Sequence, residues 1–119
     1  MDNIVQDINP KLIIVGTAEN INTPSHQIIN VARNLGIKSV GIVDSYIFAL
    51  ERFKGESSDP FNHAPDWLIV PDIRTSNCFM EAGFPERKLH IFSPPHFDFI
   101  KNKRDEFRRI GKSVIKKLK

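Results

Sequence analysis

Cysteine is nearly absent from the 119-residue chain, and Cys78 is the only one. This excludes an intrachain disulfide and any cysteine-rich metal site. The four histidines show no spacing, with one another or with carboxylates, that is typical of a metal site. The six glycines stand singly, so Gly-x-Gly-x-x-Gly and the Walker sequence, which cradle phosphates, are missing as well. We therefore expect no metal and no bound cofactor.

Long apolar runs are also missing, and none approaches the roughly 18 residues that a membrane span requires. The segment Met1–Asp7 lacks the basic and then apolar regions of a secretory signal, so we expect a cytoplasmic protein. An apolar fraction of 40% with 26% charged residues is ordinary for a soluble globular chain. At this length there is room for one domain with a modest core.

Positive charge is concentrated at the C-terminal end of the chain. Residues 100–119 hold nine Lys or Arg and two acids, whereas the preceding 99 residues hold eight basic and twelve acidic side chains. The pI of 9.2 therefore comes from this end and not from a basic domain. We expect no nucleic-acid interface spread over the fold.

The first of four short apolar runs lacks the alternation of a half-solvated strand and so predicts a strand covered on both faces, and the other three runs also predict strands. The four runs cover Lys11–Gly16, Ser39–Val43, Leu68–Val70 and Leu89–Phe92. Helical patterns separate the runs, and strands that alternate with helices predict a parallel α/β sheet. We expect a single Rossmann-like α/β domain of about four parallel strands over residues 1–99, followed by a basic amphipathic helix over residues 100–119.

Capping and stop signals place the helices between these strands. The Thr23-Pro24 pair predicts a helix start, since the hydroxyl can cap free amides and proline fits the first turn, and Gly36 ends that helix. Tyr46–Phe53 can form about two helical turns. Thr75 is expected to cap a further helix that stops at Gly83.

Polar side chains follow the ends of the predicted strands. The carboxyl ends of parallel strands share one edge, where open α/β sheets bind ligands, so we expect these side chains to gather there. The set comprises Thr17, Glu19, Asp44, Ser45, Asp72, Thr75, Ser93 and His96, with Arg52 near enough to fold back over the same edge.

Structural and functional roles compete at these positions. Asp44 can take a proton from a substrate hydroxyl, or it can have a local role, either capping a short helix at Tyr46 or bracing the loop, which we favour. Arg52 can face a phosphate or carboxylate with its planar fork, or form a salt bridge to Asp44 or Asp72 that joins two loops. Thr75 is most simply a helix N-cap.

The histidines divide in the same way. His96 follows two prolines at a strand end, where its imidazole could donate to a phosphate or move protons near neutral pH. The alternative, which we favour, is a hydrogen bond to backbone. His26 and His63 are expected on the surface, and His90 inside a strand.

Five motifs follow one another along residues 8–100. They are Gly16-Thr-Ala-Glu-Asn20, Leu35-Gly-Ile-Lys-Ser-Val-Gly-Ile-Val-Asp-Ser45 with Arg52-Phe53, Ala64-Pro-Asp-Trp-Leu-Ile-Val-Pro-Asp72 with Thr75, Gly83-Phe-Pro-Glu-Arg-Lys-Leu-His90, and Pro95-His-Phe-Asp98. In order and spacing they resemble the second half of the N-terminal domain of GT-B-type glycosyltransferases. Among these enzymes, the chain is similar to a bacterial group allied to UDP-N-acetylglucosamine 2-epimerase-like and polysaccharide-biosynthesis proteins.

The resemblance implies the acceptor-side half, or one subunit, of a nucleotide-sugar-dependent enzyme. The C-terminal donor-binding domain of that superfamily and the glycine-rich first turn have no counterpart in this sequence, so we expect no turnover by the chain alone. The implied partners are a donor-domain polypeptide or a second copy, with a nucleotide-sugar or sugar acceptor as ligand. Asp44 and His96 are the implied catalytic residues. The implied substrate-binding residues are Thr17, Glu19, Ser45, Arg52, Asp72 and Thr75.

A second hypothesis is a non-catalytic α/β binding or interaction domain that keeps the fold without the donor site. The strand order implied by the resemblance bears on this, because right-handed crossovers would place the connecting helices on one face of the sheet. The other face would then be bare and apolar. We expect the C-terminal helix to cover it with Phe107, Ile110 and Val114, in the same chain or exchanged within a dimer. The alternative is a basic helix lying on an anionic membrane.

Overall fold

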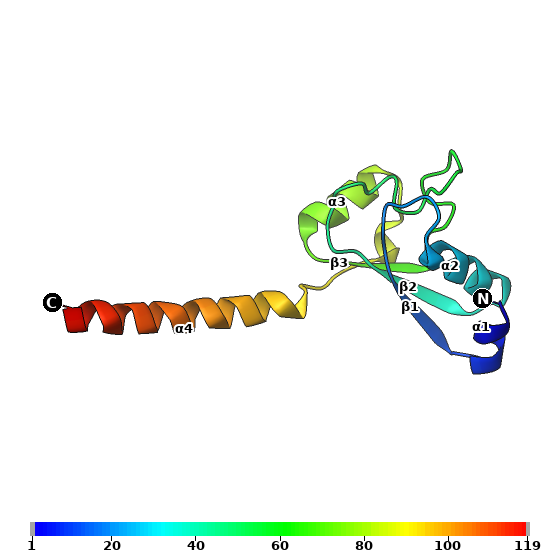
Figure 1. Cartoon of the computed structure of the whole chain (residues 1–119). Coiled ribbons are helices and arrows are strands. Elements are labelled where there is room, and N and C mark those ends of the chain that lie inside the picture. Colours follow the sequence, from blue (N-terminus) through cyan, green and yellow to red (C-terminus); the bar gives the residue numbers. More distant parts are fainter. Residues whose placement is uncertain (1, 119) are drawn as a thin grey trace.

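The computed structural model describes residues 2–118, without the side chains at positions 2, 113–115, 117 and 118. Helices and strands alternate along most of the chain, but only a long loop joins β2 to β3 (Figure 1). Their bounds are α1 Asp2–Ile8, β1 Leu12–Gly16, α2 Pro24–Asn34, β2 Lys38–Ile42, β3 Trp67–Val70, α3 Ile73–Glu81, the short 3-10 helix η1 Glu86–Lys88, β4 Leu89–Ile91 and α4 Pro95–Leu118.

The four strands form one all-parallel sheet in the order β1-β2-β3-β4. Val15 pairs with Gly41, Gly41 with Leu68, and Leu68 with Leu89, so these residues share one face. The predicted parallel α/β class, the number of strands and the long C-terminal helix are confirmed. This Rossmann-like architecture brings all four carboxyl ends to one edge of the sheet.

Helix α2 begins and ends where its signals predict. Thr23 is the N-cap, with its Oγ1 accepting a hydrogen bond from the His26 amide at 3.4 Å, and Pro24 occupies the first turn. Gly36 follows the helix with φ of +69°, a conformation that glycine adopts without steric cost.

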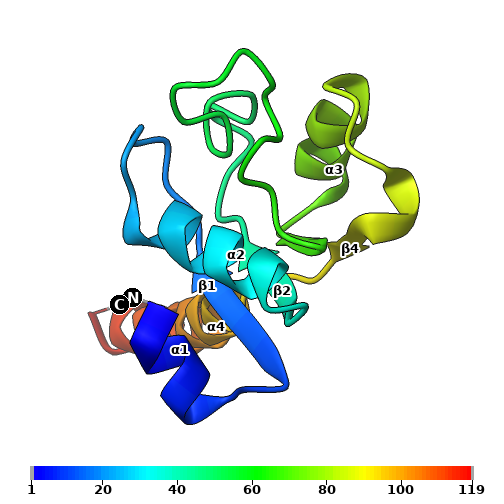
Figure 2. The same ribbon diagram turned by 90° about the vertical axis from the view of Figure 1, so that its right-hand side faces the viewer.

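The core lies on the face of the sheet that α2, α3 and the β2–β3 loop cover (Figure 2). Leu68 and Val70 point into it from β3, and the rings of Phe53 and Phe79 lie 6.2 Å apart across it. Burying such side chains contributes about 1.5–3 kcal/mol each, so this layer carries most of the stabilisation.

The opposite face is bare within one chain, as right-handed crossovers predict. Leu12 is 46% exposed, Ile14 60%, Ile42 47% and Phe92 67%. The expectation that the first strand is covered on both faces is therefore wrong, since all the connecting elements lie on one side. We call this surface the bare face; its apolar residues are Leu12, Ile14, Val40, Ile42, Trp67, Ile69 and Phe92.

Helix α4 begins at Pro95 and projects away from the α/β body, giving overall dimensions of 68 × 36 × 26 Å (Figure 1). Phe107 and Ile110 are 69% and 51% exposed, so packing of these side chains on the sheet of the same chain is wrong. The side chain of Val114 lies outside the described residues. Across residues 2–118, no helix combines the length and apolarity needed to cross a membrane.

The segment Tyr46–Phe53 forms irregular turns, so the predicted short helix is wrong. Phe48 has φ of +57°, which a right-handed helix cannot contain. The turns bury Ala49, Arg52 and Phe53 beneath the loop. Tertiary burial of these three side chains overrides the local helical preference.

Candidate functional site at the carboxyl edge

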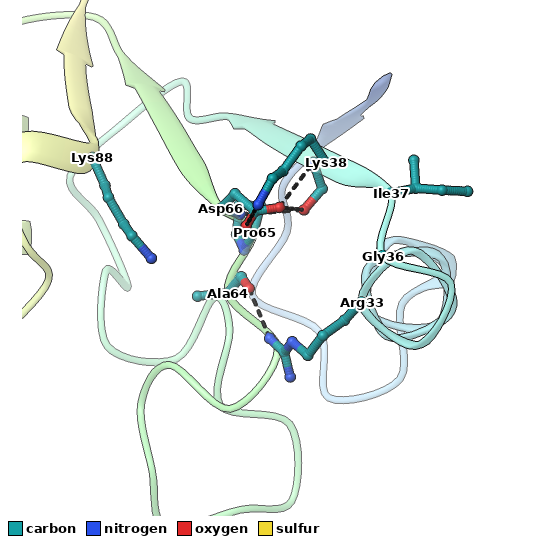
Figure 3. Close-up of a pocket in the computed structure, with 9 residues that line it drawn as sticks. Arg33, Gly36, Ile37, Lys38, Ala64, Pro65, Asp66 and Lys88 are labelled. Carbon is teal, nitrogen blue, oxygen red and sulfur yellow. Dashed lines mark hydrogen bonds and ion pairs between the residues drawn. The ribbon is translucent and has the colours of Figure 1, made fainter. Parts of the chain in front are cut away.

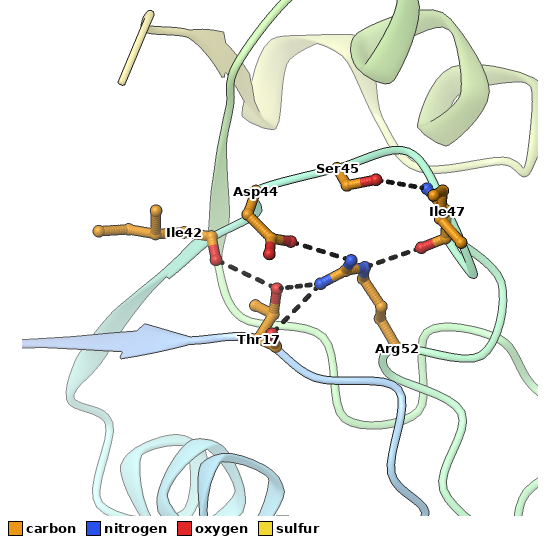
Figure 4. A network of polar contacts seen from close by, with 6 residues as sticks. All are labelled: Thr17, Ile42, Asp44, Ser45, Ile47 and Arg52. Atoms are coloured by element: carbon orange, nitrogen blue, oxygen red, sulfur yellow. Dashed lines mark hydrogen bonds and ion pairs between the residues drawn. The ribbon is translucent and has the colours of Figure 1, made fainter. Parts of the chain in front are cut away.

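A buried arginine organises the carboxyl edge of the sheet (Figure 4). Arg52 is 4% exposed and donates from Nη1 to the Thr17 carbonyl at 3.2 Å and to Thr17 Oγ1 at 3.1 Å. Its Nε donates to the Ile47 carbonyl at 3.2 Å, and Nη2 lies 3.0 Å from Asp44 Oδ1. Thr17 Oγ1 in turn donates to the Ile42 carbonyl at 3.1 Å. One side chain thus joins the ends of β1 and β2 to the following loop.

The salt bridge decides between the two interpretations of Arg52. Most of its donors are committed to protein oxygens, so it braces the loops, as the salt-bridge alternative predicted. Asp44 does not cap a helix, because Tyr46–Phe53 forms turns, but its salt bridge to Arg52 provides the loop bracing that was predicted for it. Ser45 also performs a local role, with Oγ accepting from the Ile47 amide at 3.1 Å.

The Asp44 carboxylate remains open to solvent, with its side chain 81% exposed. Its bond to the buried guanidinium fixes its position at the end of β2 while leaving an oxygen free for another donor. A carboxylate held in this way can accept a hydrogen bond from a hydroxyl group or act as a base toward it.

At the end of β3, Asp72 provides the helix cap that was predicted for Thr75. Asp72, not Thr75, is the N-cap of α3: Asp72 Oδ1 accepts from the Thr75 amide at 2.7 Å. The hydrogen bond from Thr75, with smaller contributions that include Arg74, lowers the pKa of Asp72. Thr75 is fully buried, and its Oγ1 has no hydrogen-bond partner among the described residues. The prediction of Thr75 as N-cap is therefore wrong.

Glu19, Asp72 and His96 lie outside the arginine network. Across the described part of the chain, no hydrogen bond or ion pair connects these three side chains to Arg52 or Asp44. His96 is exposed in the first turn of α4, with its ring 4.4 Å from the Phe97 ring. The structure thus gathers Thr17, Asp44 and Arg52, with Ser45 beside them.

The sequence analysis missed His26, which is 5% exposed instead of on the surface. Its Nε2 lies 2.7 Å from the Arg52 carbonyl and its Nδ1 3.2 Å from the Ile21 carbonyl. Because both partners are acceptors, the two bonds form together only when both ring nitrogens carry a hydrogen. The only sequence signal was its place in the first turn of α2.

His26 also stacks on His63, with ring centroids 4.7 Å apart. His63 is half-buried, with Nδ1 3.1 Å from Asn30 Oδ1. Burial lowers the pKa of His63, and the nearby His26 and Arg33 lower it further. The His26–His63 pair connects α2 to the end of the β2–β3 loop. The hydrogen bond between His26 and the Arg52 carbonyl also holds the backbone of that loop at Arg52.

A separate hollow of about 280 Å³ lies at the amino edge of the sheet, at the opposite end of the strands from Asp44 (Figure 3). Two of the three cations that line it are engaged: Arg33 donates to the Ala64 carbonyl at 2.9 Å, and Lys38 lies 3.5 Å from Asp66. The Lys88 side chain makes no hydrogen bond or ion pair with another described residue. Burial raises the pKa of Asp66, but hydrogen bonds from Ser39 and the charge of Lys38 outweigh it, so the pKa is lowered. The contacts of Arg33, Lys38 and Asp66 thus brace the segments that enter β2 and β3.

An apolar groove of about 410 Å³ lies between the β2–β3 loop and α3. Tyr46, Phe48 and Leu50 line it from the loop, and Cys78 and Glu81 line it from α3. Within the described residues, no group of three or more His, Cys, Asp or Glu side chains could hold a metal ion. The Arg52 network and the apolar groove both include residues of the β2–β3 loop.

The fold and the edge define a class: a Rossmann-like α/β chain with an exposed, arginine-braced carboxylate at the carboxyl ends of its parallel strands. Compared with protein-family models, with curated proteins and with solved structures, the chain has no significant match.

Proposed function

We propose that the chain is the acceptor-side part of a nucleotide-sugar-dependent, GT-B-like transferase and that it has no turnover alone. The observation that carries the proposal is the Asp44 carboxylate, fixed 3.0 Å from buried Arg52 yet 81% exposed at the carboxyl edge. Glycosyl transfer needs a group that takes the proton of the acceptor hydroxyl, and this carboxylate is open to such a hydroxyl. The order of the sequence motifs supports the same class.

Asp44 is the base in this proposal, and Thr17 and Ser45 lie beside it as substrate-binding groups. Arg52 becomes a positioning residue, since its guanidinium contacts protein oxygens. Stabilising the departing nucleotide needs preorganised positive groups near its phosphates. The cations described at this edge are engaged: Arg52 binds loop oxygens, and Arg74 lies over the Tyr46 ring at 4.1 Å. A second polypeptide would supply the donor site.

The first test is an assay of the purified chain with a panel of nucleotide-sugars, followed by the same assay with a polypeptide carrying the missing donor domain. We expect no hydrolysis or transfer by the chain alone and transfer by the mixture. Asp44→Asn should reduce the transfer rate by about 10²–10⁴-fold, whereas Glu51→Gln, an exposed acid on the same loop, should leave it unchanged. Turnover by the chain alone that disappears in Asp44→Asn would refute the proposal that a second polypeptide must supply the donor site.

A non-catalytic interaction domain is the second candidate. It is favoured by the apolar groove beside Phe48 and by the extent of the bare face, because both are surfaces for contact and not for chemistry. Under this hypothesis no donor polypeptide restores transfer, and Asp44→Asn changes only stability.

A further inference from the structure

Two large apolar surfaces of this chain are uncovered. The first is the bare face, whose Ile14 and Phe92 are 60% and 67% exposed. The second is the stripe of α4 in which Ile100, Phe107 and Ile110 recur at helical spacing, each more than half exposed. Soluble monomers rarely expose contiguous apolar patches beyond a few hundred Å². We therefore expect each surface to be covered by another part of the protein.

We propose that the chain forms a two-fold dimer in which α4 of each copy lies across the bare face of the other. Exchange of identical elements closes on itself, so no unpaired surface remains to propagate a fibre. In the structure, α4 leaves the sheet after residues 92–94 and runs outward, clear of the sheet of its own chain (Figure 1).

Charge favours this occupant over the alternatives. Residues 100–119 carry nine basic and two acidic side chains, a net charge of +7, whereas residues 1–99 carry eight and twelve, a net charge of −4. Contact between α4 and the body of another copy is therefore attractive, while pairing of two α4 helices is repulsive. A sheet-to-sheet dimer would leave the α4 stripes exposed.

The sheet limits the area that such a contact can bury. The four-stranded sheet is about 19 Å across, wide enough to receive one helix. Helix α4 is about 10 Å wide, so the part of it that lies over the strands shades about 190 Å² of the bare face. Two such contacts, counted on both partners, bury about 760 Å², an area typical of weak association. We therefore expect a dimer that dissociates on dilution.

Mixed single-cysteine variants test the exchange directly. Ile14→Cys and a mass-tagged Ile110→Cys, both in a Cys78→Ser background, are combined, left to exchange subunits and oxidised. We expect a disulfide between the two different variants, formed several-fold more than with Lys112→Cys, which lies on the side of α4 opposite to Ile110. Both target side chains are more than half exposed, so the substitutions should not prevent folding.

If α4 of a second copy does not cover the bare face, oxidation gives other disulfide products. Predominant Ile14→Cys homodimers would indicate sheet-to-sheet packing, and Ile110→Cys homodimers would indicate helix pairing. An intrachain disulfide in the double variant, without mixed product, would place α4 on its own sheet. Flotation with phosphatidylserine vesicles of a protein that gives no mixed disulfide would assign α4 to a membrane surface. Each of these results overturns the proposal.

Sedimentation provides a second, independent measurement. Phe107→Glu places a charge in the stripe and should raise the dimer dissociation constant by about 10–100-fold. Asn102→Glu adds the same charge on the opposite side of α4 and should change it far less. Equal effects would attribute association to net charge and contradict a specific helix contact. Because dimerisation is read without any enzymatic assay, its failure is distinct from failure of the proposed function.

Discussion

At the scale of single residues, Arg52 is the side chain on which the candidate site depends. Replacing it with methionine leaves the Thr17 and Ile47 carbonyls without their donor. We expect Arg52→Met to lower the free energy of unfolding by about 2–4 kcal/mol. Asp44→Asn should cost about 1 kcal/mol or less, because water can replace an exposed carboxylate. Urea denaturation measures both, and a larger loss for Asp44→Asn would contradict the bracing role.

Asp66 gives the fold a dependence on acid. Its pKa is lower in the folded chain than in the unfolded one, where it is about 3.9, so its contribution to stability is complete above that value and is lost as the pH falls through the folded pKa. We expect Asp66→Asn to lower Tm at pH 7 and to lower it less below about pH 4. Thermal unfolding followed across this range checks the sign, and a Tm difference that widens in acid would contradict it.

The residues at the site were predicted more reliably than the hydrogen bonds and ion pairs that they form. Thr17, Asp44 and Arg52 were predicted at one edge because the carboxyl ends of parallel strands must meet there. The pairing of Arg52 with Asp44 could only be left open, since both a ligand and a loop carboxylate satisfy a guanidinium. The burial of His26 depends on the distant Arg52 carbonyl, which no local pattern reveals.

At the scale of elements, the two caps show what local signals can and cannot decide. Thr23 stands alone before Pro24, and its prediction is confirmed. Asp72 and Thr75 are both good caps three residues apart, so propensity could not choose between them. In the structure Asp72 is the cap, since Thr75 is buried inside the first turn of α3.

This assignment predicts opposite outcomes for the two residues. Thr75→Val removes a buried hydroxyl that has no partner among the described residues, so stability should stay within about 1 kcal/mol or rise. Asp72→Ala should lower Tm, and Asp72→Asn, which also caps helices, should restore most of the loss. Destabilisation by Thr75→Val larger than that by Asp72→Ala would return the cap to Thr75.

The β2–β3 loop marks the limit of prediction from periodicity. Tyr46–Phe53 carries apolar residues at helical spacing, yet Phe53 and Ala49 are buried by turns that a helix could not make. The hydrogen bond from the His63 amide to the Phe53 carbonyl, at 2.8 Å, closes the loop on itself. Such contacts are set by tertiary structure, which the local sequence does not encode.

At the scale of the whole molecule, strand order and handedness were sufficient to predict a one-sided sheet. The strands follow one another in sequence order, so right-handed crossovers place α2 and α3 together on one face. The position of α4 could not be predicted in the same way, because an amphipathic helix finds an apolar surface in its own chain or in another.

The central claim is that a second copy covers the bare face. Sedimentation velocity of the unaltered chain, run from low to high protein concentration, tests it most directly. We predict a species of twice 13.6 kDa that dissociates on dilution and is more compact, for its mass, than an elongated chain of 68 × 36 × 26 Å. A single 13.6 kDa species at every concentration, with the friction of that elongated shape, would contradict the account.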